Sequence, residues 1–193
     1  MHSFFALIAR MRYISRWGLM RNTLPENIQE HSHMVAVLAH ALAVIRRDVF
    51  GGTINPDTVA AAALFHDASE IFTGDLPSPI KYLNPDIQSA YKQVEHAANE
   101  KLLALLPAPV QNAYRPLLTN VSDDTQALIK AADRLSAYIK CLEELRAGND
   151  EFAAAKREIL RSIEENALPE SSYFLEHFIP AFTLTLDELD LTM

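Results

Sequence analysis

Apolar residues recur at helical spacing along nearly the whole chain. Between Glu30 and Arg46 they alternate at steps of four and three, which places them on one face of an α-helix. This stripe comprises His31, Val35, Leu38, Leu42 and Ile45. The sequence has no convincing alternation of apolar and polar residues typical of a strand, no fixed repeat and no low-complexity segment. The pattern therefore predicts an all-α fold.

Capping residues and helix breakers mark a second helix and the loop after it. Asn55-Pro56-Asp57 is typical of a helix start, because asparagine caps free N–H groups and proline is tolerated in the first turn. The stripe of this helix runs through Val59, Ala63, His66 and Glu70. A glycine and two prolines between Thr73 and Pro79 end the helix, so a loop is expected there.

The remainder of the chain predicts further helices. One starts at Asn84-Pro85-Asp86 and ends before Pro107, and a shorter segment of roughly residues 109–118 connects it onward. A long helix runs from the cap at Ser122 to about Ala147, and two or three helical segments follow. The inward residues of the long helix are Leu128, Ala132, Leu135, Ile139 and Leu142. Because no linker is long enough to separate domains, we expect residues 1–193 to form a single helical bundle.

The composition fits such a bundle and excludes several classes of enzyme. The chain has 193 residues, of which 49% are hydrophobic and 22% are charged, which is enough apolar material for a buried core. Its five glycines form neither a G-x-G-x-x-G nor a G-x-x-x-x-G-K-[ST] pattern, so the phosphate loops of dinucleotide-binding and P-loop enzymes are excluded. The single cysteine, Cys141, excludes an internal disulfide, a cysteine-based zinc site and a four-cysteine iron–sulfur cluster.

The charge and the hydropathy of the chain limit the cellular location and the binding partners to be expected. The net charge is −8, although residues 1–22 contain four arginines and no acidic residue. This balance disfavours a nucleic-acid polymer as the main ligand but allows a small anion held by local arginines. The N-terminus lacks the features of a signal peptide, and no apolar run approaches the ~20 residues that span a membrane. Together with the lone cysteine, these features predict a soluble cytoplasmic protein without a membrane partner.

Four polar residues stand on or beside the apolar stripes, where core residues would be expected. They are His31, the pair His66-Asp67, and Asp133, each placed on a predicted helix. A lone inward histidine is more often a hydrogen-bonded core residue than a metal ligand. Two imidazoles and two carboxylates near one apolar core would, however, be costly without partners, and they suit a divalent first-row metal ion. The set therefore predicts one metal site.

The same residues carry a resemblance to a known family. His31, His66-Asp67 and Asp133 are similar to the H…HD…D pattern of the HD-domain superfamily of metal-dependent phosphohydrolases, which are all-helical. More narrowly, five blocks resemble the bacterial 5'-deoxynucleotidases. They are R-W at 16–17, E-N-x-x-E-H-S at 26–32, H-D-A-S-E at 66–70, T-G-D-L-P at 73–77 and K-C-L-E-E at 140–144. The resemblance covers most of the chain and implies one HD domain.

The resemblance implies an activity and a set of site residues. The reaction would be hydrolysis of deoxyribonucleoside 5'-monophosphates to deoxyribonucleosides and phosphate, by a homodimer with one divalent ion per subunit, Co²⁺ or Mn²⁺. The implied ligands are His31, His66, Asp67 and Asp133. The resemblance implies that Arg16 binds the phosphate and that Trp17 lies at the sugar 2' position. It also implies that Asp75 contacts the sugar and that the wall beside it is formed by Leu76, Pro77 and Ser78. Asp67 and Asp133 would lie close to the substrate as well. Ser78 departs from the threonine expected there.

Glu70 is the candidate general acid or base. It follows His66 by four residues, which on one continuous helix would point its carboxylate into the same cleft. The alternatives are a partner that orients a ligand histidine, or a surface carboxylate. The reaction also has alternatives: another substrate such as a cyclic nucleotide, a deoxynucleoside triphosphate or a guanosine polyphosphate, or a non-catalytic HD module that only binds nucleotide.

Other polar residues have simpler interpretations. Asp123-Asp124 is expected to cap a helix, and Glu143-Glu144 to form a solvated helix face. Arg46-Arg47 is also expected to be solvated. Four histidines match no ligand position and are interpreted as ordinary surface or core residues: His33, His40, His96 and His177.

Overall fold

The structure, a computed structural model, describes residues 1–81, 83–166 and 168–189, with the side chain of Ser78 also outside the described part. The described residues contain α-helices and short 3₁₀-helices (η), and one isolated bridge between Ser15 and Asn27. The α-helices are α1 (Phe4–Ile8), α2 (Ile28–Asp48), α3 (Pro56–Ala63), α4 (Glu70–Thr73), α5 (Ser78–Lys81), α6 (Pro85–Ala104), α7 (Ala108–Leu118), α8 (Asp123–Arg146), α9 (Ala153–Glu165) and α10 (Pro169–His177). The 3₁₀-helices are η1 (Ala9–Tyr13), η2 (Asp150–Phe152) and η3 (Ile179–Thr183). The predicted all-α fold is confirmed.

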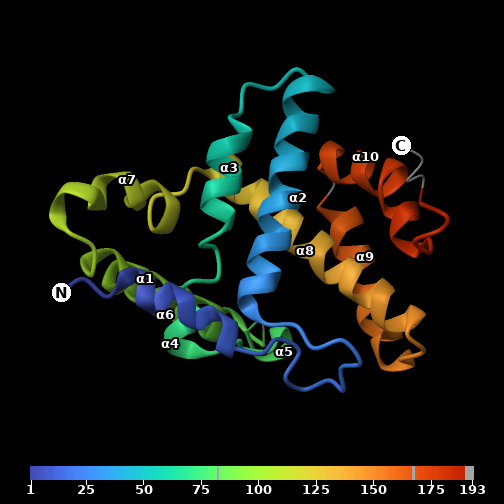
Figure 1. The fold of residues 1–193 in the computed structure, drawn as a ribbon, viewed down its shortest axis with the longest axis horizontal. Helices are drawn as coiled ribbons and strands as arrows, with labels where there is room; N and C mark the ends of the chain where they lie inside the picture. Colours follow the sequence, from blue (N-terminus) through green and yellow to red (C-terminus); the bar gives the residue numbers. More distant parts are fainter. Residues whose placement is uncertain (82, 167, 190–193) are drawn as a thin grey trace.

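The centre of the fold is formed by α2, which packs against α3 and α8 (Figure 1). The stripe predicted for α2 is buried along its length, as are Leu128, Ala132 and Leu135 of α8. These faces join residues of α9, α10 and η3 in one hydrophobic core. Packing two long helices side by side fixes the relative position of any residues that they carry.

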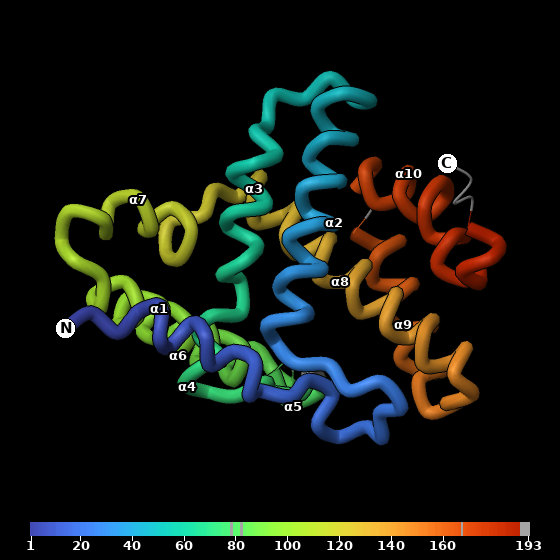
Figure 2. The backbone as a smooth tube through the Cα atoms, viewed as in Figure 1, coloured from blue at the N-terminus to red at the C-terminus, as the bar shows by residue number. Residues whose placement is uncertain are grey.

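A second, smaller core lies at the other end of the molecule. It gathers Phe4 of α1, Leu102 and Leu103 of α6, Leu118 of α7 and Ala68 of the segment after α3. Figure 2 shows α1 running alongside α6 at this end, away from α10 and the C-terminus. The chain therefore passes from the first core to the second immediately after Ala63, which belongs to the first.

The helices differ from the prediction in two boundaries and in the burial of α6. The helix that starts at Asn55 ends at Ala63, short of His66 and Glu70. The loop expected between Thr73 and Pro79 includes the start of α5, and the connecting segment is the helix α7, with Pro109 in its first turn, where the missing N–H costs little. The apolar residues that recur at helical spacing in α6 are buried only toward its C-terminal end, because Ala98 and Leu102 are buried whereas Val94 is 48% exposed.

No helix of the described residues combines the length and the apolar content that crossing a membrane would require.

Candidate metal centre

His31 and Asp133 meet because α2 and α8 pack together. His31 stands in the first turn of α2, which starts where the Asn27 side chain accepts a hydrogen bond from Glu30 N–H. The His31 side chain is fully buried, and its Nε2 lies 3.0 Å from Asp133 Oδ1. Burial alone would raise the pKa of Asp133, but the adjacent imidazole of His31 lowers it to about 2. The carboxylate of Asp133 is therefore the form that faces the imidazole.

His66 and Asp67 lie in a turn, and their placement on a helix was wrong. After Ala63 the backbone hydrogen bonds tighten to three-residue steps: His66 N–H donates to Ala63 at 3.3 Å, and Glu70 N–H to Asp67 at 3.0 Å. This tighter winding carries the chain from the first core to the second. The turn places Asp67 Oδ2 3.1 Å from His66 Nε2 and 3.6 Å from His31 Nε2.

The charges of this cluster depend on one another. Burial alone would raise the pKa of Asp67, but the imidazoles of His66 and His31 hold it well below its usual range. Burial lowers the pKa of His66, yet the charge of Asp67 outweighs this effect and the net pKa is raised. The two carboxylates are thus held ionised beside two histidines.

Both histidines leave one buried ring nitrogen without a hydrogen bond. His66 Nδ1 lies 2.8 Å from the Ala63 carbonyl, which can only accept, so in the neutral ring Nδ1 carries the proton and Nε2 the lone pair. His31 Nδ1 contacts Ser136 Oγ at 3.2 Å. Nε2 of each ring is buried and faces a carboxylate oxygen, of Asp133 at 3.0 Å and of Asp67 at 3.1 Å, without forming a well-aligned hydrogen bond. Anchoring one ring nitrogen so that the other is free is the usual arrangement of a metal-ligating histidine.

The donor set fits a divalent metal ion. One ligand atom each from His31, His66 and Asp133 lies within 4.8 Å of the others, and Asp67 is adjacent. Two neutral nitrogens and two anionic oxygens suit a first-row divalent ion rather than a soft, thiol-seeking one. The structure therefore brings together the four residues that the sequence predicted as ligands.

Glu70 is the first residue of α4, and not one turn further along the helix of His66 as the spacing suggested. Its side chain is 5% exposed, and Oε2 is buried without a hydrogen-bond partner. Burial, with the nearby charges of Asp67 and Asp75, raises the pKa of Glu70 to about 9. A buried carboxyl group therefore borders the cluster.

Arg16 and Trp17 belong to a loop that the sequence did not predict, here called the N-terminal loop (residues 14–27). Its two ends are tied by the Ser15–Asn27 bridge and by a 3.0 Å hydrogen bond from Arg16 N–H to the Glu26 carbonyl. The Arg16 guanidinium lies 3.7 Å from Glu26 Oε2, and its buried Nη1 has no hydrogen-bond partner.

The loop reaches the residues after α4 through Trp17. Its backbone N–H donates to Asp75 Oδ2 at 3.2 Å, and its indole Nε1–H donates to Glu26 Oε2 at 3.0 Å. Burial raises the pKa of Asp75, although the positive charge of Arg16 opposes that rise. Leu76 and Pro77 follow, both partly buried, while the predicted contact of the Ser78 side chain lies outside the described part.

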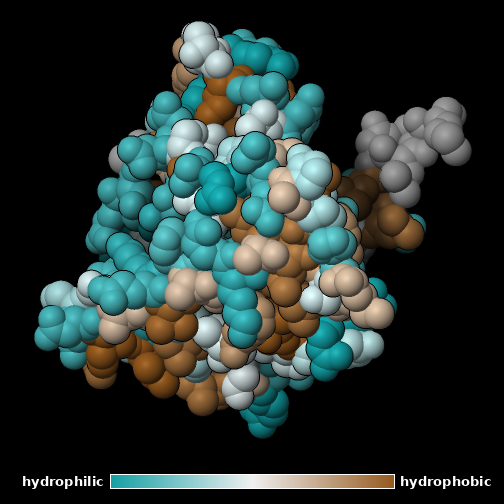
Figure 3. Space-filling view, turned by 90° about the vertical axis from the view of Figure 1, so that its left-hand side faces the viewer, coloured by the Kyte–Doolittle hydropathy of each residue, from teal (hydrophilic) through white to brown (hydrophobic). Residues whose placement is uncertain are grey.

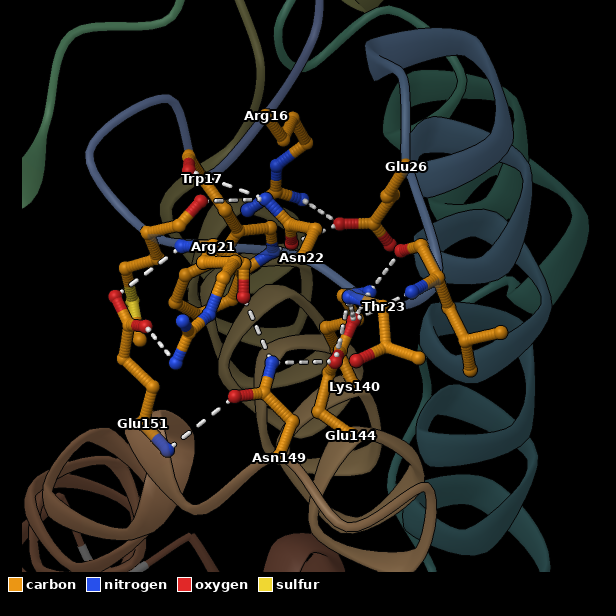
Figure 4. A network of polar contacts seen from close by, with 12 residues as sticks. Arg16, Trp17, Arg21, Asn22, Thr23, Glu26, Lys140, Glu144, Asn149 and Glu151 are labelled. Carbon is orange, nitrogen blue, oxygen red and sulfur yellow. Dashed lines mark hydrogen bonds and ion pairs between the residues drawn. The ribbon is translucent and has the colours of Figure 1, made fainter.

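Some residues that hold this loop, and one arginine elsewhere, were missed or misread in the sequence. Figure 4 shows Glu144 and Asn149, near the C-terminal end of α8, directed toward the loop that carries Arg16 and Trp17. Glu144 is fully buried, so its expected position on a solvated face was wrong. Arg46 was also misread, because it pairs with the buried Glu170 at 2.6 Å. The only signals were the blocks at 26–32 and 140–144, which include Glu26 and Glu144 without indicating what they do.

The simpler interpretations hold for the remaining polar residues. Asp123 and Asp124 form the first turn of α8. Four histidines are exposed: His33, His40, His96 and His177.

Comparison with solved structures defines the class to which the fold belongs. An HD-domain phosphohydrolase of Listeria innocua has a TM-score of 0.79 with 24% identity, over 93% of this chain and 88% of that one. The cyanophage S-2L HD phosphohydrolase DatZ, solved with dA and one catalytic Zn²⁺ ion, has a TM-score of 0.64 with 21% identity, over 93% and 96%. The fold is that of the HD-domain phosphohydrolases.

Sequence comparison narrows this class to one family. The family model described as 5'-deoxynucleotidase YfbR-like matches residues 3–182. A 5'-deoxynucleotidase of Vibrio cholerae is 52% identical and one of Vibrio parahaemolyticus 50% identical, each over 96% of this chain and 97% of the relative. The chain belongs to the YfbR-like 5'-deoxynucleotidase family.

Proposed function

We propose that this protein hydrolyses deoxyribonucleoside 5'-monophosphates to deoxyribonucleosides and phosphate. The observation that carries the proposal is a group of buried polar atoms without hydrogen-bond partners, from four separate segments of the chain. They are Arg16 Nη1, His31 Nε2, His66 Nε2 and Glu70 Oε2. Leaving such atoms unpaired is costly, and a metal ion together with a phosphate group would supply partners for all of them. The names of the relatives that are about half identical support the same reaction.

The proposed metal ligands are His31, His66, Asp67 and Asp133, with Co²⁺ or Mn²⁺ as the favoured ions. The mixed nitrogen and oxygen donors support this choice without excluding Zn²⁺, the ion named for DatZ. When bound, a divalent ion supplies positive charge for a phosphoryl oxygen and makes a water more nucleophilic.

Phosphate binding and proton transfer are assigned to two residues of the chain. Arg16 binds the phosphate, because a guanidinium group donates parallel hydrogen bonds to two phosphate oxygens. Glu70 moves a proton: as the oxygen of a water molecule bonds to phosphorus and the bond from phosphorus to the 5' oxygen breaks, its carboxyl group protonates the leaving oxygen, and the carboxylate then regains the proton that the attacking water loses. Its burial and its unpaired Oε2 support this role over that of a surface carboxylate. Orientation of a ligand histidine by Glu70 remains the competing role.

Sugar recognition is assigned to the segment where the N-terminal loop meets the residues after α4. Trp17 crowds the 2' position, so that a ribose hydroxyl is rejected, and Asp75 binds the sugar. The 3.2 Å hydrogen bond between Trp17 N–H and Asp75 supports a joint site. Leu76, Pro77 and Ser78 form the adjacent wall of this proposed pocket.

The proposal is tested by phosphate release from paired deoxyribo- and ribonucleoside 5'-monophosphates. Chelator-stripped protein receives Co²⁺, Mn²⁺, Mg²⁺ or Zn²⁺ one at a time, and the expected result is metal-restored release from the deoxy members. Glu70→Gln should lower kcat with unchanged metal content if Glu70 transfers protons, whereas a loss of metal would favour the orienting role. Release only from a cyclic nucleotide, a triphosphate or a guanosine polyphosphate would replace the substrate, and binding without release would leave a nucleotide-binding module.

Assembly as a homodimer is proposed from the surface at the α1–α6 end. Phe5 of α1, Leu83 just before α6 and Val94 of α6 are 61%, 68% and 48% exposed. Figure 3 shows hydrophobic side chains gathered along the lower part of this side. Light scattering should give a mass twice that of one chain, and Val94→Asp should reduce it. A monomer at all concentrations would contradict the proposed homodimer.

We also propose that the protein is located in the cytoplasm, and cell fractionation tests this location.

A further inference from the structure

Trp17 has a strained backbone that its surroundings must hold in place. Its φ is 59°, in the left-handed region, where an L-residue loses roughly 1–2 kcal/mol through contact of its Cβ with the backbone. The Trp17 carbonyl accepts hydrogen bonds from Met20 N–H at 2.9 Å and Asn22 Nδ2 at 3.3 Å. These contacts lie within the N-terminal loop itself. Outside the loop, the Trp17 N–H donates to Asp75 Oδ2 at 3.2 Å, which holds Trp17 on one side only. A second anchor is therefore needed to keep the far part of the loop, and with it Trp17, in this conformation.

Glu144 is that anchor, with four donor groups converging on its carboxylate. Thr23 N–H donates to Oε2 at 2.9 Å, and Leu24 N–H donates to Oε1 at 2.9 Å. Lys140 Nζ, one turn earlier on α8, lies 2.5 Å from Oε1 and also contacts the Leu24 carbonyl. Asn149 Nδ2 donates to Oε2 at 2.8 Å.

Asn149 and Phe152 extend the anchor to the rest of the loop. Asn149 Nδ2 also donates to the Arg21 carbonyl at 2.7 Å, so that one amide group joins Glu144 to the loop (Figure 4). The Trp17 indole packs on the buried Phe152, with 5.3 Å between ring centroids. The Lys140 ammonium lies 5.7 Å from the centroid of the same Phe152 ring. The conformation of Trp17 is thus connected to Glu144 through contacts on two sides.

The same helix carries the anchor and a proposed metal ligand. Glu144 follows Asp133 by eleven residues on α8, which corresponds to about 16 Å along a continuous helix. A helix buried between α2 and α9 is a stiff connection over this distance. The position of Arg16 and Trp17 relative to the metal centre is therefore fixed through α8.

We propose that Glu144 is a positioning residue for substrate recognition: by holding residues 21–24 it places Arg16 and Trp17 for the phosphate and the sugar. The inference rests on the proposed function, because it assigns Arg16 and Trp17 to the substrate. It predicts that loosening Glu144 weakens binding and sugar discrimination without removing the metal.

The structure indicates which substitution tests this role. Both carboxylate oxygens of Glu144 receive only donors, so the amide N–H₂ of Glu144→Gln would face Lys140, Asn149 or the loop N–H groups without an acceptor. Glu143→Gln is the matched control, because it makes the same charge change one residue earlier on an exposed side chain. Asn149→Ala is a milder second variant, which removes the connection to the Arg21 carbonyl and leaves the Glu144 carboxylate in place.

The experiment compares these variants in kinetics and in a signal independent of activity. For Glu144→Gln we expect a KM for a deoxynucleoside 5'-monophosphate raised about tenfold or more and a smaller deoxy-to-ribo ratio of kcat/KM. Metal content per subunit should stay at the wild-type level. Trp17 is the only tryptophan, so its fluorescence should change in Glu144→Gln and, less strongly, in Asn149→Ala. Glu143→Gln should match the wild type throughout.

Two results would overturn the proposal. A folded Glu144→Gln protein with lower stability but unchanged KM, sugar discrimination and tryptophan emission would reduce Glu144 to a structural residue. Unchanged hydrogen exchange of residues 16–24 in both Glu144→Gln and Asn149→Ala would refute the anchor itself. If the wild type releases no phosphate from any deoxynucleotide, the proposed function fails instead, while hydrogen exchange and tryptophan emission still decide whether Glu144 holds the loop.

Discussion

Metal binding should raise the melting temperature of the wild-type protein much more than that of Asp133→Asn. The four proposed ligands come from positions 31, 66, 67 and 133, so the unfolded chain offers no preformed site. In the folded protein His31 is fully buried, and Nε2 of both histidines lacks a hydrogen-bond partner. An ion that binds only the folded state stabilises it by RT ln(1 + [M]/Kd), which is about 2.7 kcal/mol at a hundredfold excess over Kd.

The expected shift follows from the size of the chain. An unfolding entropy of about 2.1 cal/mol/K per residue over 193 residues gives roughly 0.4 kcal/mol/K. Dividing about 2.7 kcal/mol by this value predicts a rise of about 7 °C. Asp133→Asn removes an anionic ligand, and a hundredfold weaker Kd would leave about 0.4 kcal/mol, or about 1 °C.

The assay is a thermal melt of chelator-stripped protein, with and without Co²⁺, Mn²⁺ or Zn²⁺. Glu143→Gln, which changes an exposed carboxylate on the same helix, should show the wild-type shift. Equal shifts in the wild type and Asp133→Asn would refute the assignment of Asp133 as a ligand. No shift with any of the three ions would refute the metal site.

Three further predictions concern recognition and stability. Arg16→Ala should lower kcat/KM for a deoxynucleoside monophosphate about 10- to 100-fold, since a charged hydrogen bond contributes about 1.5–3 kcal/mol, and a loss under twofold would contradict the phosphate role. Trp17→Ala should bring the deoxy-to-ribo ratio of kcat/KM toward one, and an unchanged ratio would refute crowding at the 2' position. Burial alone would raise the pKa of Glu144, but hydrogen bonds from Lys140 and Asn149 lower it from 4.5 to about 2. Its ionised form therefore stabilises the fold fully above pH 4.5, and this contribution is lost as the pH falls toward 2. Urea unfolding should accordingly show a stability difference between wild type and Glu144→Gln that is largest at neutral pH and shrinks below pH 4.5, whereas a pH-independent difference would contradict the pKa shift.

Local pattern was sufficient for the helices that form the main core. The stripe of α2 and the inward residues of α8 depend on the helical period alone, and both are buried as predicted. The turn that carries His66 and Asp67 was taken for part of a helix. Over a single turn, winding of three residues per turn places side chains on nearly the same face as an α-helix of 3.6 residues per turn, so the two have similar sequence patterns. The sequence therefore indicated the right side chains near the core but the wrong backbone beneath them.

Glu144 was misread for a different reason, because what buries it lies far away in sequence. Beside Glu143 near the end of α8 it has the character of a solvated helical residue, and its partners Thr23 and Leu24 are 121 and 120 residues away. No spacing rule within a helix signals that a distant loop will supply two N–H groups to one carboxylate. Buried charge of this kind becomes predictable only when the loop and the helix are placed together.

Metal binding and substrate recognition depend on different parts of the fold. Among the proposed ligands, His31 and Asp133 stand on helices packed into the main core, which suits a metal centre that needs fixed distances. Arg16 and Trp17 stand on a loop whose conformation depends on a few polar contacts with the end of α8. Changes at those contacts should therefore alter which nucleotide is accepted before they alter metal binding. Among relatives, we therefore expect differences in substrate preference to accompany changes at Glu26, Glu144 or Asn149 first.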